Sequence, residues 1–178
     1  MEESDLPFPE LPPEEGLWDT GSLLCPYMPS VDEKVREMFL AAKICDKDVI
    51  VDLGCGDGRV LFEAANVGCK SAIGVELNHD LVLIGRERIE KSGLSEKIRI
   101  LEDDFMNIDI SEATIIYLYL LPEAIDKLKP MLIRALNGNA RLLISAHFSI
   151  REWRISEDTR VDGFNCYTKE SFADYVSK

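Results

Sequence analysis

Short apolar runs alternate with amphipathic stretches along most of this chain. The apolar runs are rich in Val, Ile and Leu, as buried strands are, and the amphipathic stretches repeat their apolar residues at helical spacing. Strands are predicted at 49–53, 71–76, 98–102, 114–120 and 140–146, and helices at 59–67, 79–92 and 122–136. Strands that alternate with helices predict an α/β protein in which helices cover both faces of a doubly wound, mostly parallel sheet.

The two ends of the chain depart from this alternation. Residues 1–19 are acidic and rich in proline and contain no Lys or Arg, so we expect a flexible arm followed by a single domain at 20–178. Ser30 and Glu33 have the spacing of a capping box, which predicts that a helix begins here. Beyond the fifth strand the pattern weakens, and a short helix is predicted near 169–177.

The first predicted strand, at 49–53, runs into a glycine-rich turn at 54–58. Glycines let the backbone approach a ligand closely, and the free N–H groups at the start of the following helix add positive potential. A dinucleotide-binding fingerprint would need a glycine where Arg59 stands, and the Gly-Lys-Ser/Thr of a phosphate loop is absent from the sequence. Asp52, inside the end of the strand, suits a cationic ligand better than a pyrophosphate.

Acidic residues also end the next two strands. Glu76 lies 24 residues after Asp52, and an acid at the end of the second strand of such a unit accepts hydrogen bonds from ribose hydroxyls. Asp103 and Asp104 close the third strand and are followed by Phe105. These acids are therefore expected at the rim of one ligand site.

The pattern Asp-x-Gly-x-Gly-x-Gly at 52–58 resembles motif I of the class I S-adenosylmethionine (SAM) methyltransferases. The resemblance implies SAM as the cofactor and a Rossmann-like sheet of seven strands, closed by a short antiparallel pair at 155–161 and 163–168. It also implies that Asp104, or Asp103 in the alternative register, reaches the adenine amino group while the next residue covers the ring. The implied SAM-binding residues are Tyr27, Asp52, Gly54, Cys55, Gly56, Glu76, Leu77, Asp104, Phe105 and Tyr119.

Further segments resemble one branch of this class. Cys-Pro-Tyr-Met-Pro-Ser at 25–30 and Gly-Val-Glu-Leu-Asn at 74–78 are similar to the protein lysine methyltransferases that include the enzyme acting on the c-ring protein of mitochondrial ATP synthase and archaeal broad-specificity enzymes. The chain departs from the family pattern at Met28, where Val is usual, and at Cys55, where Ser is usual. It also lacks the membrane segment of the mitochondrial members, which puts their substrate in doubt. The resemblance implies a protein lysine as methyl acceptor.

Tyrosines near the expected site are candidates for positioning that acceptor. Tyr27 lies between two prolines that hold it extended, and Tyr119 ends the fourth strand. Tyr117 shares the strand face of Tyr119 and is the fallback. Enzymes that methylate base amino groups carry Asn/Asp-Pro-Pro-Tyr/Phe here, whereas this chain has Tyr-Leu-Leu-Pro at 119–122. Aromatic rings suit an aliphatic amine, whose methylene stem packs on them and whose charge makes cation–π contacts.

The two histidines and one arginine also lie near these motifs. His147 follows the fifth strand and is either a catalytic base or an ordinary loop or core residue. His79 precedes the second predicted helix and is expected to be a surface or capping residue. Arg59 is expected to bond locally or to pair with an acid such as Asp57.

Composition limits the class of protein and its partners. At 178 residues, with 46% hydrophobic and 30% charged residues, the chain has the balance of one soluble globular domain. Because no apolar run reaches the roughly 18–20 residues of a membrane span and no signal peptide is visible, a cytoplasmic protein is expected. Five cysteines, at 25, 45, 55, 69 and 166, lack metal-ligand spacing and indicate mostly buried thiols in a reducing compartment without a metal site.

The net charge of −13 disfavours a nucleic-acid partner and favours a basic protein substrate, although acidity can serve solubility alone. Two alternatives stay open beside a protein-lysine methyltransferase. One is a small-molecule methyltransferase, for which residues 1–29 would serve as a lid. The other is a SAM-binding module without catalytic activity. The oligomeric state does not follow from the sequence.

Overall fold

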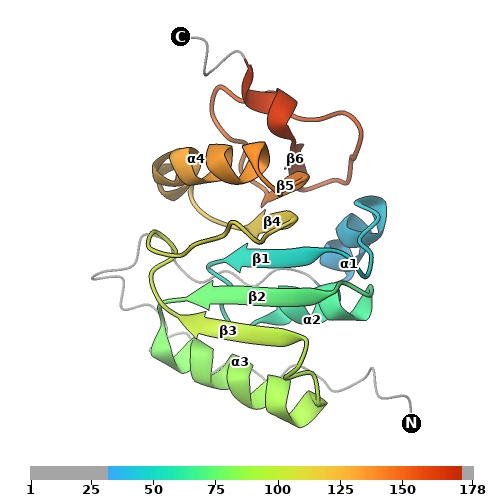
Figure 1. The fold of residues 1–178 in the computed structure, drawn as a ribbon, viewed down its shortest axis with the longest axis vertical. Helices are drawn as coiled ribbons and strands as arrows, with labels where there is room; N and C mark the ends of the chain where they lie inside the picture. Colours follow the sequence, from blue (N-terminus) through green and yellow to red (C-terminus); the bar gives the residue numbers. More distant parts are fainter. Residues whose placement is uncertain (1–31, 174–178) are drawn as a thin grey trace.

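The computed structural model describes residues 32–173 and shows helices packed around one twisted sheet (Figure 1). The elements are α1 (Asp32–Ala41), β1 (Val49–Leu53), α2 (Arg59–Asn66), β2 (Ser71–Glu76), α3 (His79–Ser92), β3 (Ile98–Glu102), β4 (Ile115–Leu118), α4 (Pro122–Asn137), β5 (Leu142–Ala146), β6 (Phe164–Tyr167) and the short 3-10 helix η2 (Lys169–Phe172). The predicted alternation of strands and helices is confirmed. Tyr27, Ser30 and the predicted arm at 1–19 lie outside the described residues.

The sheet has the strand order β3-β2-β1-β4-β5-β6, in which β6 is antiparallel to β5 and the other pairs are parallel. The order reverses direction between β1 and β4, since the chain moves from β1 outward to β3 and then returns to β4. In α/β proteins of this kind the loops at the carboxyl ends of two such strands diverge and form a crevice that binds ligands. The predicted ligand site falls at this place.

Helices cover both faces of the sheet, as predicted. Alternate side chains of β1 point to opposite faces, so that Ile50 belongs to one apolar cluster and Val51 to the other. The first cluster holds the buried stripes of α1, α2 and α3, and Figure 1 shows α2 behind the strands. The second cluster holds the buried face of α4 together with Trp153 and Phe172.

Helix ends agree with the residues that the sequence places there. The Asn78 side chain accepts hydrogen bonds from the N–H groups of Asp80 and Leu81, which caps the start of α3. The same helix ends at Gly93, whose φ of 70° is readily adopted only by glycine. These caps fix the position of α3 directly after Glu76.

The prediction of seven strands is wrong for the described residues, which form six. A strand, β6 (Phe164–Tyr167), forms within the expected range 163–168, but 155–161 form no strand. This segment follows β6 only as far as a hydrogen bond from Ser156 N–H to Cys166 O, at 2.8 Å. Its Ser-Glu-Asp-Thr-Arg sequence at 156–160 offers no apolar side chain to pack against the sheet, so the chain bends away from it.

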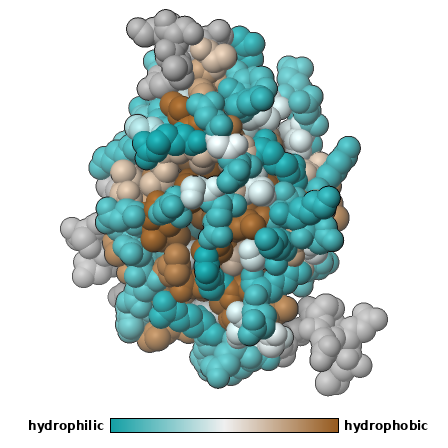
Figure 2. Space-filling view, viewed as in Figure 1, coloured by the Kyte–Doolittle hydropathy of each residue, from teal (hydrophilic) through white to brown (hydrophobic). Residues whose placement is uncertain are grey.

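Residues 103–114 connect β3 to β4 without forming a helix. Ile110 and Ala113 are buried in the cluster on the α4 side of the sheet, and Met106 and Ile108 pack against it. Figure 2 shows apolar atoms gathered in the middle of the face opposite α2, with polar side chains around them. Residues 103–114 therefore cover part of this face of the sheet, as a helix would in their place.

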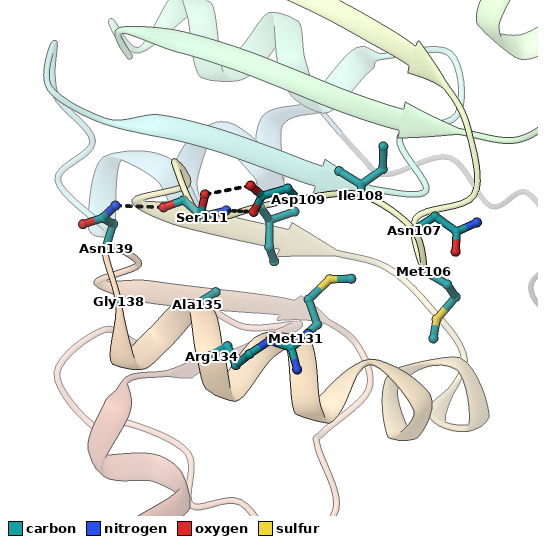
Figure 3. Close-up of a pocket in the computed structure, with 11 residues that line it drawn as sticks. Met106, Asn107, Ile108, Asp109, Ser111, Met131, Arg134, Ala135, Gly138 and Asn139 are labelled. Atoms are coloured by element: carbon teal, nitrogen blue, oxygen red, sulfur yellow. Dashed lines mark hydrogen bonds between the residues drawn. The ribbon is translucent and has the colours of Figure 1, made fainter.

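A cavity of about 540 Å³ lies between this connection and α4 (Figure 3). Met131 and Arg134 of α4 line one side, and Ile108 and Asp109 line the other. Its far end lies near Asn139, just past the end of α4. Its other end is lined by Met106 and Asn107, which directly follow the predicted site residue Phe105.

Candidate active site

The glycine-rich turn after β1 has a backbone that glycine alone adopts readily. Gly54, Gly56 and Gly58 have φ values of 82°, 56° and 82°. The N–H groups of Gly54 and Cys55 donate to Val75 O of β2 at 2.8 and 3.0 Å. The turn is thereby held against the end of β2, and α2 begins directly after it.

Glycine is also required beneath this turn, in the middle of β2. A Cβ added at Gly74 would lie 2.4 Å from Cys55 Sγ and 2.8 Å from a terminal methyl carbon of Leu61. Cys55 is 5% exposed, and burial raises the pKa of its thiol well above the ordinary value, as do the charges of Asp52, Glu76 and Asp57. Cys55 is therefore a small packing residue and not a reactive thiolate. Gly74 was not among the residues predicted from the sequence, although a glycine inside a strand often marks such a close approach.

Glu76 holds the turn together from the end of β2. Its Oε2 accepts a hydrogen bond from Gly56 N–H at 2.9 Å, and its Oε1 accepts from the N–H groups of Leu77 and Asn78 at 2.9 and 2.8 Å. A carboxylate offers about four lone-pair sites. These three hydrogen bonds fix the orientation of the Glu76 carboxylate and leave a lone pair that can accept a hydrogen bond from a ligand hydroxyl beside the loop.

Asp52 and Asp57 are both buried beside this loop, at 2% exposure each. Burial raises the pKa of Asp52 well above its ordinary value, and the charges of Glu76 and Asp57 raise it further. Asp57 carries its own counter-charges, from Arg59 at 2.9 Å and Arg88 at 3.5 Å. The predicted pairing of Arg59 with Asp57 is confirmed. The excess of acid at this place favours a ligand that brings positive charge.

The acids after β3 stand next to Glu76. Asp103 N–H donates to Glu76 O at 3.1 Å, and the carboxylate of Asp103 accepts from Asp104 N–H at 2.7 Å. The carboxylate of Asp104 accepts from Met106 N–H at 2.8 Å. Phe105 is half-buried, and Leu77 exposes 46% of its surface although it is apolar. A polar edge and apolar side chains thus lie together at the ends of β2 and β3.

An aromatic cluster follows β4 and β5 on the other side of the crevice. The ring of Tyr119 lies 5.0 Å from the ring of His147 and 6.4 Å from the ring of Phe148, measured between centroids. Tyr119 is half-buried and His147 is exposed. The parallel register pairs Leu53 of β1 with Leu118 of β4, so Tyr119 begins beside the glycine-rich turn.

Tyr117 does not belong to this cluster, which excludes it as the fallback for Tyr119. It is 1% exposed and packs against Phe39 of α1 and Phe164 of β6, at centroid distances of 6.0 and 6.3 Å. It does share the strand face of Tyr119, as predicted. His79 is exposed, and its Nδ1 lies 2.8 Å from Glu102 Oε1, in agreement with a surface position.

The predicted site residues from Asp52 to Tyr119 thus meet at one edge of the sheet, whereas Tyr27 lies outside the described residues. Phe148 and Gly74 are the additions that the structure makes. Within residues 32–173, no cluster of His, Cys, Asp and Glu has the arrangement of a metal site. No helix in the same range is long and apolar enough to cross a membrane.

Solved structures of methyltransferases share this fold. An RNA methyltransferase from Salinibacter ruber, in complex with S-adenosyl-L-homocysteine, superposes with a TM-score of 0.69 and 30% sequence identity, covering 79% of this chain and 91% of that one. A SAM-dependent methyltransferase from Geobacter sulfurreducens, also with S-adenosyl-L-homocysteine, superposes with a TM-score of 0.52 at 16% identity over 70% of this chain and 50% of that one. The fold is that of the Rossmann-like methyltransferases.

The family follows from the sequence of the same region. A model of the ANTKMT methyltransferase domain matches residues 52–157, and the chain belongs to this family. A protein-lysine N-methyltransferase from Saccharolobus islandicus is 38% identical over 141 residues, which are 79% of this chain and 87% of that protein. The adenine nucleotide translocase lysine N-methyltransferase of Mus musculus is 30% identical over 59% of this chain, which spans only 45% of the mouse protein.

Proposed function

We propose that this chain is a SAM-dependent protein-lysine N-methyltransferase. The observation that carries the proposal is the 38% identity to a protein named for that activity, over 87% of its length. The crevice at the ends of β1 and β4 supports it, because a glycine-rich turn, strand-end acids and an aromatic cluster meet there. SAM, when bound, supplies an activated methyl group that an amine takes up by in-line displacement.

The residues at this crevice fit SAM. The proposed cofactor site places the ribose hydroxyls at Glu76, whose carboxylate is already oriented by three N–H donors. Asp104 and Phe105 would meet the adenine, with Leu77 covering its other side. The turn at 54–56 would lie against the amino-acid part of the cofactor, and Asp52 would balance its positive charge. Cys55 contributes its small volume.

Tyr119 is the proposed residue that positions the acceptor amine, together with Tyr27 on the evidence of the sequence alone. A free lysine has a pKa of about 10.4, so it must lose a proton before it can attack. Removal from water lowers that pKa, and so does a nearby positive charge. An apolar, aromatic-lined entrance therefore favours the neutral amine, and water is a sufficient proton acceptor. Holding the two reactants in line supplies about 7–11 kcal/mol in favourable cases.

The proposed partner is a protein with an accessible lysine, and the proposed location is the cytoplasm. The net charge of −13 fits a basic protein surface and opposes non-specific binding to nucleic acid. The likeness to an RNA methyltransferase makes RNA the alternative acceptor that an experiment must separate from protein. A small-molecule acceptor is the third outcome.

Transfer of labelled methyl groups from SAM into a cell lysate tests the proposal. Parallel samples are treated with protease or nuclease, and the protein is compared with Glu76→Ala and with the control Glu102→Ala. Glu102 pairs with Glu76 in the register of β2 and β3, but it bonds to His79 at the surface. We expect labelled bands that disappear with protease and with Glu76→Ala, survive nuclease and Glu102→Ala, and release methylated lysine on hydrolysis.

Label that is lost with nuclease would overturn the proposal in favour of RNA. Label found only in small molecules would do the same in favour of a small-molecule methyltransferase. SAM binding without any transfer would indicate a binding module without catalytic activity.

A further inference from the structure

His147 has a strained backbone at the edge of the proposed active site. Its φ is 60°, in the left-handed region that few residues other than glycine adopt. Phe148 N–H donates to Ala146 O at 2.7 Å, across His147. A hydrogen bond between residues two apart around a positive φ is the mark of a rare, strained γ-turn. Strain of this kind persists only where the surroundings enforce it.

The surroundings of this turn are built to hold it. His147 N–H donates to Gly163 O at 2.7 Å, and the Asn165 side chain donates to His147 O at 3.4 Å. From the other side, the hydroxyl of Ser145, which is fully buried, donates to Phe148 O at 2.7 Å. The ends of β5 and β6 therefore fix His147 in a conformation that an unconstrained loop would avoid.

The consequence of this conformation is a ring stacked on Tyr119. The two ring planes are inclined by 32° with centroids 5.0 Å apart, a tilted face-to-face approach within the distance range of favourable aromatic pairs. Phe148 approaches Tyr119 as well, at 6.4 Å and 37°. The turn at His147 thus places the rings of two consecutive residues, His147 and Phe148, against Tyr119.

We propose that His147 is a positioning residue for the acceptor amine, which acts by holding the ring of Tyr119 through stacking. The inference rests on the proposed function for its kinetic consequence, but the stacking itself can be tested without an acceptor. His147 acts here through the face of its ring and not as a proton acceptor. The turn holds the imidazole in place, and the imidazole limits the rotation of the phenol that the acceptor meets.

Substitutions at position 147 separate the ring from the turn. His147→Asn and His147→Gly both tolerate a positive φ and both remove the ring. His147→Phe restores an aromatic face that carries no titratable nitrogen. Thermal unfolding of each variant shows whether the fold is kept, and calorimetric titration with SAM shows whether the cofactor site is intact.

The first measurement is NMR relaxation of selectively labelled tyrosine in the protein without acceptor. We expect the Tyr119 ring to become mobile in His147→Asn and His147→Gly and to stay ordered in His147→Phe. An equally ordered Tyr119 ring in all variants would overturn the proposal, whatever the enzyme methylates.

The second measurement is steady-state kinetics on the acceptor protein labelled in the transfer experiment. We expect kcat/KM for the acceptor to fall about three- to tenfold in His147→Asn, the equivalent of one stacked aromatic pair. We expect His147→Phe to recover most of the loss, with SAM affinity changed less than twofold in every variant. Equal losses in His147→Asn and His147→Phe, with the fold and SAM affinity kept in both, would overturn a role by stacking.

Discussion

The buried carboxyl of Asp52 is expected to destabilise the folded protein without ligand and to favour the binding of a cationic ligand. It is buried, and burial together with the charges of Glu76 and Asp57 raises its pKa well above the ordinary value of 3.8. A carboxyl with a raised folded-state pKa contributes its stability fully below the unfolded pKa and loses it as pH rises through the folded pKa. Ionised Asp52 therefore opposes folding at high pH unless a cation is bound beside it.

We predict that Asp52→Asn stabilises the protein without ligand and weakens SAM binding. Asn keeps the shape of the side chain but cannot ionise, so the free energy of unfolding at pH 8 should rise by on the order of 1 kcal/mol. The Kd for SAM should increase tenfold or more because the counter-charge is lost. Urea unfolding at pH 5 and pH 8 and calorimetric titration measure both effects. A stabilisation as large at pH 5 as at pH 8 would show that ionisation is not its cause.

Glu76 offers a sharper test, because Glu102 is a matched residue on the adjacent strand. Glu76→Gln would turn one of the oxygens that accept from backbone N–H groups into a donor. Hydrogen bonds to a charged group contribute about 1.5–3 kcal/mol, so we expect at least tenfold weaker SAM binding. Glu102→Gln removes only surface pairs with His79 and Arg86 and should change the Kd less than twofold. Similar losses in the two variants would contradict the assigned role of Glu76.

Single residues were predictable from the sequence where strand ends alone place them. Asp52 and Glu76 could be found because parallel strands bring their carboxyl ends to one edge of a sheet. Burial was not predictable in the same way, because Tyr117 and Tyr119 share a strand face and only packing against Phe39 and Phe164 makes Tyr117 a core residue. The contact between Tyr119 and His147 depends on how β5 leaves the sheet, which no local pattern records.

The close packing of the glycine-rich turn on β2 is the structural requirement behind the motif. We predict that Gly74→Ala destabilises the protein by about 1–3 kcal/mol, since its Cβ would lie 2.4 Å from Cys55 Sγ and the neighbouring backbone must shift. SAM affinity should fall with it, because Cys55 and Gly56 move together. Urea unfolding and calorimetric titration measure the two effects. Unchanged affinity in a destabilised variant would mean that the turn tolerates displacement.

The strands and helices themselves were predicted within a few residues, apart from the last part of the sheet. The Val- and Ile-rich runs of β1 and β2 are buried on both sides, so these two strands follow from their residue types. The edge strand β3 alternates buried Ile98 and Ile100 with exposed Arg99 and Glu102, which is the period of a half-buried strand. The end of the sheet differs, because a strand at its edge forms only if a partner and an apolar face are available. A strand was predicted at 155–161 because methyltransferases of this class have one there. The segment forms none, because the polar residues at 156–160 provide no apolar face to pack on the sheet.

The edge of the sheet opposite the active site is held by Asp48, which connects four parts of the chain. Its carboxylate accepts from Arg141 Nε and Nη2 at 3.0 and 2.8 Å, from Thr114 Oγ1 at 2.8 Å and from Cys45 N–H at 3.0 Å. Arg141 also donates to Ala42 O, just past the end of α1. The starts of β1, β4 and β5 are thus joined to α1 at one carboxylate.

We predict that this cluster sets part of the acid sensitivity of the whole fold. Burial raises the pKa of Asp48, but the hydrogen bonds from Arg141, Thr114 and Cys45 outweigh burial and lower it from 3.8 to about 2. Its contribution is therefore complete above the unfolded pKa and is lost as pH falls from about 4 to about 2. Allowing for the exposure of Arg141, the contribution is roughly 1–2 kcal/mol.

Asp48→Asn checks this prediction. The variant should be less stable than the parent at pH 7, and the difference between them should shrink as the pH is lowered toward 2. Urea unfolding at several pH values measures the difference. A gap that stays constant with pH would assign the effect of the substitution to packing.

The net charge of −13 acts on the molecule as a whole and separates two explanations of its acidity. If the charge attracts a basic acceptor protein, salt should weaken the encounter, because the Debye length falls from about 10 Å at 0.1 M to about 3 Å at 1 M. We then expect the KM for the acceptor to rise several-fold between 0.05 and 0.5 M NaCl while kcat changes less than twofold, since salt screens long-range attraction more than the short contacts of the bound complex. A KM that does not change with salt concentration would mean that the acidity serves solubility. The acceptor would then be selected by shape alone, at the aromatic cluster around Tyr119.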